Sequence, residues 1–173
     1  MTSPFRGTTL HVLAVAALLL LVGVAASFQW PQDITGAVTK DVRCVVPALG
    51  MKISGNAVFC TGEYTFADGV EVDGRGITLD CNGAVLRGEG RGTGVTIRGE
   101  NIVIKDCIIE RFLYGVSVEG SENRIENLEM RENFYGIYLS SGKSNSVYNN
   151  RFRGNQQDLV GQGDNAVWGN MFS

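Results

Sequence analysis

Apolar and polar residues alternate with period two in short segments of the chain, and the same arrangement of segments recurs three times. Written in register, the copies are GVTIRGENIVIKDCIIERFLY (94–114), GVSVEGSENRIENLEMRENFY (115–135) and GIYLSSGKSNSVYNNRFRGNQQ (136–157). Period-two alternation is typical of strands, and Gly, Asn, Ser and Asp separate the short strands, as turns require. Three short strands in each repeat of about 21 residues, with no helical segment, predict one coil of a parallel β-solenoid.

A weaker copy at residues 69–93 precedes these three and a partial one at residues 159–172 follows, so we expect an all-β solenoid of about 4–5 coils. Stacking the copies aligns charges of alternating sign, which stabilise neighbouring strands where like charges would oppose them. The four charged columns are Asp73/Arg98/Glu119, Asp80/Lys105/Glu126, Glu110/Arg131 and Arg111/Glu132.

The same register predicts the interior of the solenoid. Its four apolar columns are Val70/Val95/Val116/Ile137, Val72/Ile97/Val118/Leu139, Leu79/Ile104/Ile125/Val147 and Val85/Ile109/Met130/Phe152. A further column contains Asp106, Asn127 and Asn149, and its neighbour ends in Asn150 and Asn170. Stacked amides in successive coils predict a hydrogen-bonded ladder at this corner.

The segments ITLDCNG, GVTIRGENIVIKDC, YGVSVEGSENRIENL and YGIYLSSGKSNSVYNNRF resemble the right-handed parallel β-helix proteins of pectin-lyase-like fold. Within that group the chain is most similar to the short-coil, NosD-like proteins of bacterial and archaeal cell surfaces. The resemblance extends over residues 44–172 and implies a right-handed helix, whereas the repeats by themselves indicate only a solenoid.

The N-terminal residues 1–27 read as a targeting segment. Arg6 precedes the apolar run Val12–Ala26, and small residues follow it, as in a secretory signal peptide cut after Ala26 or Ser27. The alternative is an uncleaved membrane anchor over residues 10–28, which His11 interrupts. Either interpretation places the remainder outside the cytoplasm, in the extracellular space or at the cell surface.

Residues 28–68 do not fit the repeat, and we interpret them as a linker and N-terminal cap ahead of the β-helix repeats at 69–173. Cys44 and Cys60 bracket a short loop, which predicts a disulfide in an exported protein. Cys81 and Cys107 lie one coil apart and form either a second disulfide or two small buried residues. We favour this pairing among the three connectivities. A metal site lacks histidine partners and close cysteine spacing, so neither a metal nor another cofactor is expected.

Catalysis is the first functional class to weigh, because enzymes of the resembled fold act on acidic polysaccharides as lyases, hydrolases or epimerases. Such chemistry needs arginines or paired carboxylates. The candidates are Arg111, Arg131, Arg151 and Arg153, with Asp80, Asp106, Glu110 and Glu132. Most of them already have partners of opposite charge across coils, and two of the coils have 21 residues and the third 22, which leaves no long loop to wall a cleft. We therefore favour a non-catalytic protein.

Binding is the second class. Tyr114 and Tyr135 share a column and Tyr138 lies nearby, so these rings are candidates for stacking on sugars, although some of them serve equally as corner or core residues. The net charge of −3 gives no basic patch for nucleic acid or an anionic membrane. We expect a structural or adhesive module of the cell envelope, with a carbohydrate-binding module or a small polysaccharide-active enzyme as alternatives. The last coil either stacks on another chain or is covered by Trp168 and Phe172.

Overall fold

The computed structural model describes residues 43–161 and 163–173 as a solenoid of short strands. The predicted signal or anchor segment, residues 1–27, and the linker up to residue 42 lie outside the described residues. Within the described part the chain forms eighteen strands and no helix, so it contains no helix that is long and apolar enough to cross a membrane.

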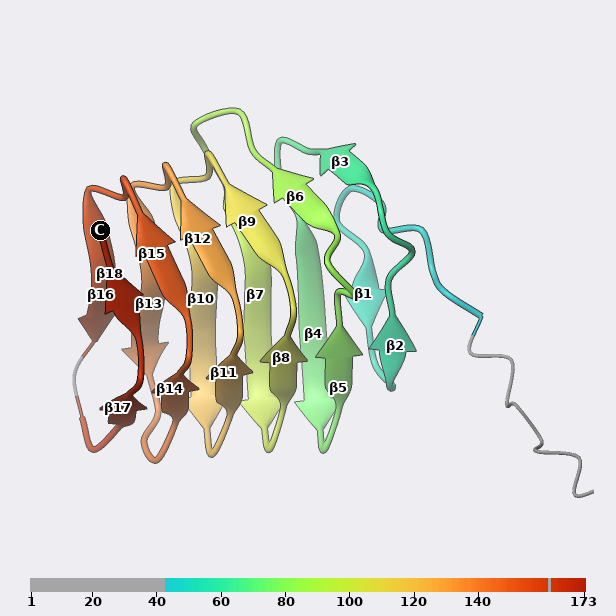
Figure 1. Cartoon of the computed structure of the whole chain (residues 1–173). Helices are drawn as coiled ribbons and strands as arrows, with labels where there is room; N and C mark the ends of the chain where they lie inside the picture. Colours follow the sequence, from blue (N-terminus) through green and yellow to red (C-terminus); the bar gives the residue numbers. More distant parts are fainter. Residues whose placement is uncertain (1–42, 162) are drawn as a thin grey trace, which may run out of the picture. The chain divides into compact units, whose positions relative to one another are not determined.

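The strands form three parallel sheets of six, and each coil of the chain contributes one strand to each sheet (Figure 1). The first sheet contains β1 (Lys52–Ile53), β4 (Val70–Arg75), β7 (Thr93–Glu100), β10 (Tyr114–Ser121), β13 (Tyr135–Ser141) and β16 (Gln157–Gly161). The second contains β2 (Ala57–Val58), β5 (Thr78–Asp80), β8 (Val103–Lys105), β11 (Arg124–Glu126), β14 (Ser146–Tyr148) and β17 (Ala166–Trp168). The third contains β3 (Glu63–Thr65), β6 (Val85–Arg87), β9 (Ile108–Glu110), β12 (Glu129–Arg131), β15 (Arg151–Arg153) and β18 (Met171–Phe172).

Three of the four predicted core columns lie in register and are buried. Val70, Val95, Val116 and Ile137 stack in the first sheet, beside Val72, Ile97, Val118 and Leu139, and Leu79, Ile104, Ile125 and Val147 stack in the second. The extra residue of the 22-residue coil is absorbed as a bulge after Val118, where Glu119 pairs with Ser141. The inward side chains are thus aliphatic at almost every level, which supplies a continuous core.

The fourth predicted column is wrong at one position. Val85 pairs with Ile108, and it is Leu86 that stacks on Ile109 in the core. The corner between β5 and β6 has four residues, Cys81–Ala84, whereas the corner between β8 and β9 has two. Because side chains alternate sides along a strand, a miscount of one residue exchanges inside for outside.

At this corner the backbone changes direction at a single residue in the left-handed (positive φ) conformation. The predicted Asp106, Asn127 and Asn149 column has this role, with φ of 57°, 55° and 56°. Asn and Asp tolerate this conformation better than other residues with a Cβ. The column therefore makes the corner, and the amide ladder lies in the neighbouring column.

The amide ladder connects each coil to the next. Asn150 Oδ1 accepts the Leu128 N–H (2.9 Å), and its Nδ2 donates to the Ile125 carbonyl (2.9 Å). Matching ladders run at the other two corners. They involve Asn123, Asn145 and Asn165 at one corner and Asn133 and Asn155 at the other. Each buried corner amide thereby satisfies backbone groups that face the core.

The first coil starts before residue 69, inside the segment that we interpreted as linker and cap. Strands β1, β2 and β3 pair in parallel with β4, β5 and β6, and Ile53 aligns with Val72. The repeat is hard to detect there because the coils differ in length. Residues 43–51 precede this first coil, and Val45 bridges to Phe59.

Candidate functional site

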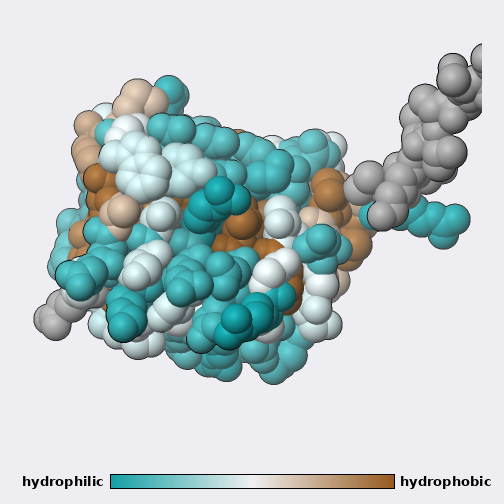
Figure 2. Space-filling model, turned by 90° about the horizontal axis from the view of Figure 1, so that it is seen from below, coloured by the Kyte–Doolittle hydropathy of each residue, from teal (hydrophilic) through white to brown (hydrophobic). Residues whose placement is uncertain are grey.

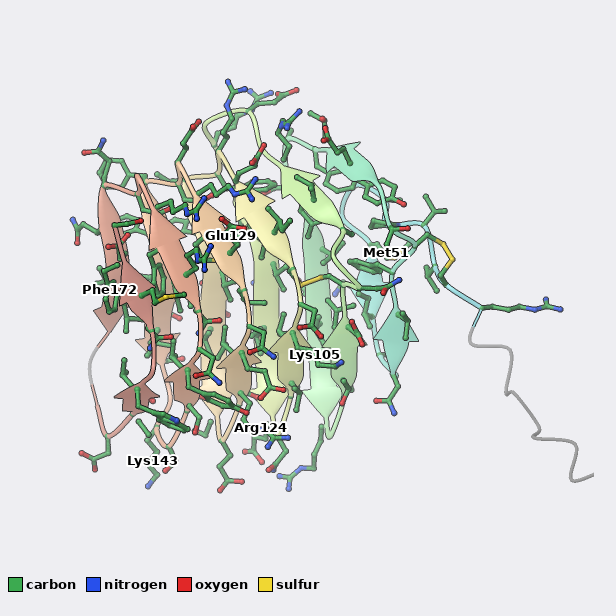
Figure 3. The ribbon with its side chains drawn as sticks, viewed as in Figure 1. Met51, Lys105, Arg124, Glu129, Lys143 and Phe172 are labelled. Carbon is green, nitrogen blue, oxygen red and sulfur yellow. A yellow bond between two sulfur atoms is a disulfide. The ribbon has the colours of Figure 1, made fainter. Side chains whose placement is uncertain are left out.

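Two disulfides fix the N-terminal half of the solenoid. One joins Cys44 to Cys60 and the other joins Cys81 to Cys107 across adjacent coils, with Cα–Cα separations of 4.8 Å in both. Figure 3 shows their yellow bonds against the ribbon. The second bond lies in the corner that Asn150 and Asn170 occupy in later coils. The cysteines are thus structural cross-links, and both pairs close loops of the folded chain.

An ion-pair ladder occupies the outer face of the third sheet. Glu110 is 8% exposed and lies between Arg87 (2.6 Å from Nε) and Arg131 (3.7 Å from Nη1). Glu129, labelled in Figure 3, accepts from Arg131 (2.7 Å), and Arg153 lies 3.3 Å from its other oxygen. The hydrogen bond from Arg131 holds the pKa of Glu129 below its usual range, so this carboxylate stays ionised at neutral pH.

The remaining catalytic candidates do not converge on one place. Lys105 pairs with Asp80 (2.5 Å) and Asp106 (3.2 Å) on the second sheet, and their hydrogen bonds, that of Asp80 foremost, raise the pKa of Lys105. Arg111 and Glu132 turn corners, with φ of 61° and 52°. Within the described ranges, no three His, Cys, Asp or Glu side chains come together in a way that could hold a metal ion.

The aromatic candidates do come together, on the outer face of the first sheet. Tyr114 stacks on Tyr135, with ring centroids 5.0 Å apart and planes 10° from parallel. Tyr138 lies against both rings at 5.2 and 5.6 Å, and Phe134 packs edge-on against Tyr135 at 4.8 Å. Phe134 is 45% exposed, and Leu113 in the adjacent coil is 37% exposed. We refer to Leu113, Tyr114, Phe134, Tyr135 and Tyr138 as the aromatic ridge.

The orientation of the rings limits what the ridge can stack on. The 5.0 Å between Tyr114 and Tyr135 nearly equals the spacing of neighbouring strands, about 4.8 Å. The two rings therefore stack along the solenoid axis and turn their edges outward, so they are not a flat platform lying on the sheet. The face of Tyr114 that Tyr135 leaves uncovered is directed toward Thr93, its partner in the preceding coil.

A hollow of about 260 Å³ lies over the earlier coils of the same sheet, and Tyr114 is not part of its lining. Its lining consists of Gly50, Asp68, Gly69, Val70, Glu71, Thr93 and Thr96. It exists because small residues stand where later coils have tyrosines: Thr93 aligns with Tyr114, and the column of Thr96 leads through Ser117 to Tyr138. Sequence reasoning missed these lining residues, and the signal was this change of residue size within a column.

Polar groups in the hollow are held in place by the fold. Asp68 Oδ1 accepts the backbone N–H of Thr93 (3.0 Å). Glu71 pairs with Lys52 (2.9 Å) and Arg98 (3.0 Å), and the hydrogen bond from Lys52 is the main cause that lowers the pKa of Glu71. The hollow therefore combines two fixed carboxylates with two threonine hydroxyls.

The last coil carries exposed apolar side chains. Trp168 stacks on Tyr148 (4.6 Å) and Phe172 on Phe152 (5.1 Å), so each ring continues its own column. Val167, Trp168, Met171 and Phe172 are between 46% and 57% exposed. The face seen in Figure 2 is otherwise mainly hydrophilic, with hydrophobic atoms visible between the polar side chains.

Comparison with protein families agrees with this geometry. The family model described as "right handed beta helix region" matches residues 50–172, which begin just before β1 and end with β18. No significant match is found among curated proteins or among solved structures. The match covers well over half of the chain. It also gives the handedness of the solenoid, which the repeats alone do not determine. The chain therefore belongs to the right-handed β-helix family.

Proposed function

We propose that this protein acts outside the cytoplasm as a non-catalytic interaction module of the cell envelope or the extracellular space. The observation that carries the proposal is the aromatic ridge. Aromatic groups that gather on one face and stay partly exposed are typical of interaction sites, since they bury large areas with few rotatable bonds. Around the ridge, the charged side chains of the three sheets largely pair with one another.

The compartment is supported by the cysteines. The four cysteines all form disulfides, at Cys44–Cys60 and Cys81–Cys107. Structural disulfides form and persist in oxidising compartments and are rare in the cytoplasm. A surface or extracellular location is consistent with this chemistry and with the signal or anchor segment predicted at residues 1–27.

A structural role fits two carboxylates of the ion-pair networks, Glu129 and Glu71. A general acid on a glycosidase needs a raised pKa, so that it holds a proton at working pH. Here the hydrogen bond from Arg131 lowers the pKa of Glu129, and that from Lys52 lowers the pKa of Glu71. Both groups are therefore stabilised as carboxylates, which suits structural ion pairs better than proton transfer.

The ridge is tested by binding of the exported protein to purified envelope polysaccharide and to whole cells. We expect Phe134→Ser to weaken retention by about tenfold, because its ring is exposed and packs only edge-on against Tyr135. Val46→Ser is the matched control, since Val46 is 61% exposed but lies in the segment before the first coil. Equal retention of the two variants would contradict the proposal.

Carbohydrate binding is the second candidate, favoured by the three tyrosine rings gathered on one face, Tyr114, Tyr135 and Tyr138. Aromatic rings are common in sugar sites, where the apolar face of the sugar packs against them. A glycan array probed with the exported protein tests this candidate. If no glycan on the array binds, carbohydrate binding is refuted, and the partner of the module is then a protein.

Self-association through the last coil is a further proposal, supported by the exposure of Trp168 and Phe172. An unpaired strand edge next to exposed apolar groups favours pairing with another chain. Sedimentation velocity over a range of concentrations tests it, with Trp168→Arg expected to abolish any dimer. A protein that stays monomeric throughout would refute this contact.

A further inference from the structure

The corner between β6 and β7 is longer than its counterparts in later coils. It has five residues, 88–92, whereas the later corners between the third and the first sheet have three, at 111–113, 132–134 and 154–156. The extra residues form a loop that extends beyond the neighbouring corners (Figure 1). A Cβ placed on Gly90 would meet no heavy atom within 4 Å apart from its chain neighbours, so the tip of the loop stands clear of the fold. Exposed loop tips of small and polar residues are preferred sites of proteolytic cleavage.

Arg91 is the residue of this loop that a protease can recognise. Its side chain is 70% exposed and pairs with Glu89, two residues earlier (2.9 Å). An ion pair between two exposed side chains is weak, so Glu89 does not keep Arg91 from a binding pocket. Endopeptidases of the trypsin type hold an arginine in a pocket that contains an aspartate, and they cut the peptide bond that follows it.

The backbone of Arg91 is not tied to the neighbouring coils. Among the residues that the structure describes, none forms a hydrogen bond with the Arg91 N–H or carbonyl. Lys143, labelled in Figure 3, also lies in a loop, but its N–H donates to Ser121 Oγ (3.2 Å) and its carbonyl accepts the Glu122 N–H (3.0 Å). Cross-coil bonds of this kind must open before a protease can take up the chain, and at Arg91 there are none to open.

The other basic residues of the solenoid are restrained in the same way as Lys143. Arg111 donates its N–H to the Arg131 carbonyl (3.1 Å), and its own carbonyl accepts the Gly90 N–H (2.7 Å). The rest lie within strands, at Lys52, Arg75, Arg87, Arg98, Lys105, Arg124, Arg131, Arg151 and Arg153. Within the described part of the chain, Arg91 is therefore the basic residue after Cys44 whose backbone is least restrained.

A cut after Arg91 leaves the chain covalently connected. Cys81 and Cys107 are bonded to each other and enclose the Arg91–Gly92 bond between them. Both cysteines are buried, at 0% and 1% exposure, so external thiols do not reach them in the folded protein.

The new chain end also keeps its place in the first sheet. The Gly92 carbonyl accepts the Tyr114 N–H (3.1 Å), and the Thr93 N–H donates to Asp68 Oδ1 (3.0 Å). Neither hydrogen bond uses an atom of the peptide group that is cut. The coil that begins at β7 is thus held from both sides after cleavage.

We propose that the Arg91–Gly92 bond is a processing site for an endopeptidase of the trypsin type, whose cut yields a two-chain module joined by the Cys81–Cys107 disulfide. Hydrolysis adds one water across this bond and leaves a carboxylate on Arg91 and an ammonium group on Gly92. The inference is independent of the interaction function proposed above, because it concerns the backbone of one loop.

The test is limited digestion of the folded, full exported chain with trypsin, with products identified by intact mass. We expect the first product from within the solenoid to be the fragment 92–173, which appears after reduction, whereas the unreduced nicked chain remains one covalent species. Arg91→Gln should slow the formation of this fragment by about tenfold or more, because the recognised side chain is lost. Lys143→Gln is the matched control and should leave the rate unchanged.

Three results would overturn the proposal. A first cut after another basic residue between positions 44 and 173 would refute the assignment of the site. Fragments that separate without reduction, or a nicked chain that loses the β-sheet signal in circular dichroism, would refute the two-chain module. A folded chain that stays uncut at Arg91, under conditions in which the reduced and unfolded chain is digested, would refute both.

Discussion

Replacing Asn133 by leucine isolates the contribution of one rung of the amide ladder. Asn133 is 1% exposed, its Oδ1 accepts the Phe112 N–H at 3.0 Å, and its Nδ2 donates to the Ile109 carbonyl at 3.0 Å. Leucine has the same branched arrangement of heavy atoms, so the change removes these two hydrogen bonds and the one from Nδ2 to Asn155 Oδ1 (3.1 Å) without opening a cavity. Asn155 keeps one donor, the backbone N–H of residue 133.

The expected cost follows from the two backbone groups left without partners. Each buried unsatisfied donor or acceptor costs about 1–3 kcal/mol, which gives about 2–6 kcal/mol for the Phe112 N–H and the Ile109 carbonyl together. The additional apolar burial of leucine offsets about 1–2 kcal/mol of this. We therefore expect the free energy of unfolding to fall by about 1–4 kcal/mol.

The assay is urea unfolding with the disulfides intact, combined with hydrogen exchange at the Phe112 amide. Exchange should accelerate at Phe112 because its N–H loses its acceptor. Glu132→Gln is the control: it changes the preceding corner residue and should alter stability by less than about 0.5 kcal/mol. If Asn133→Leu costs less than about 1 kcal/mol and leaves exchange at Phe112 unchanged, the ladder does not stabilise the coil by satisfying buried groups.

Three further predictions concern glycine stacking, cross-linking and pH. Gly99→Ala should destabilise by about 1–3 kcal/mol in urea, since its Cβ would lie 1.9 Å from the carbonyl oxygen of the glycine one coil below, whereas Gly55→Ala meets open space and should be neutral. Replacing Cys81 and Cys107 together by serine should lower the free energy of unfolding by about 3 kcal/mol, because the bond closes a loop with a sequence separation of 26. The pKa of Glu129 is lowered in the folded protein, so its ionised form stabilises the fold at any pH above its ordinary pKa of 4.5. This stabilisation is lost as the pH falls through the lowered pKa. Glu129→Gln should therefore flatten the acid limb of stability against pH; an unchanged limb would show that the Arg131 bond does not persist in solution.

Periodicity made most of the fold predictable. A column of Val95, Val116 and Ile137 repeats one physical requirement at every coil, so each copy confirms the others. The error at Val85 arose where the period fails, at the four-residue corner before β6. The missed first coil has the same cause, because β1 to β3 lie in a stretch whose spacing differs from that of the later coils. Corner length is a local property of the backbone, and one residue decides which side chains point inward.

The candidate site was only partly predictable. The sequence brings Tyr114, Tyr135 and Tyr138 to one face, and the structure places them in contact. It does not reveal the plane of the rings, which depends on how neighbouring rings pack at the strand spacing. It also does not reveal the hollow, which Gly50, Asp68 and Thr93 line from different coils.

The two kinds of column therefore have different consequences for a solenoid. Where a column repeats one residue type, as in the corner asparagines, each side chain uses its polar groups or ring faces on the next coil and adds stability. Where the type changes, one side chain is left with an unused face and the neighbouring coil leaves space. The step from Thr93 to Tyr114 is such a change and lies beside the hollow. Extending the tyrosine column by Thr93→Tyr should therefore place a third ring on Tyr114 at about the strand spacing and preserve the fold, and loss of the folded structure in this variant would contradict the assignment of the column.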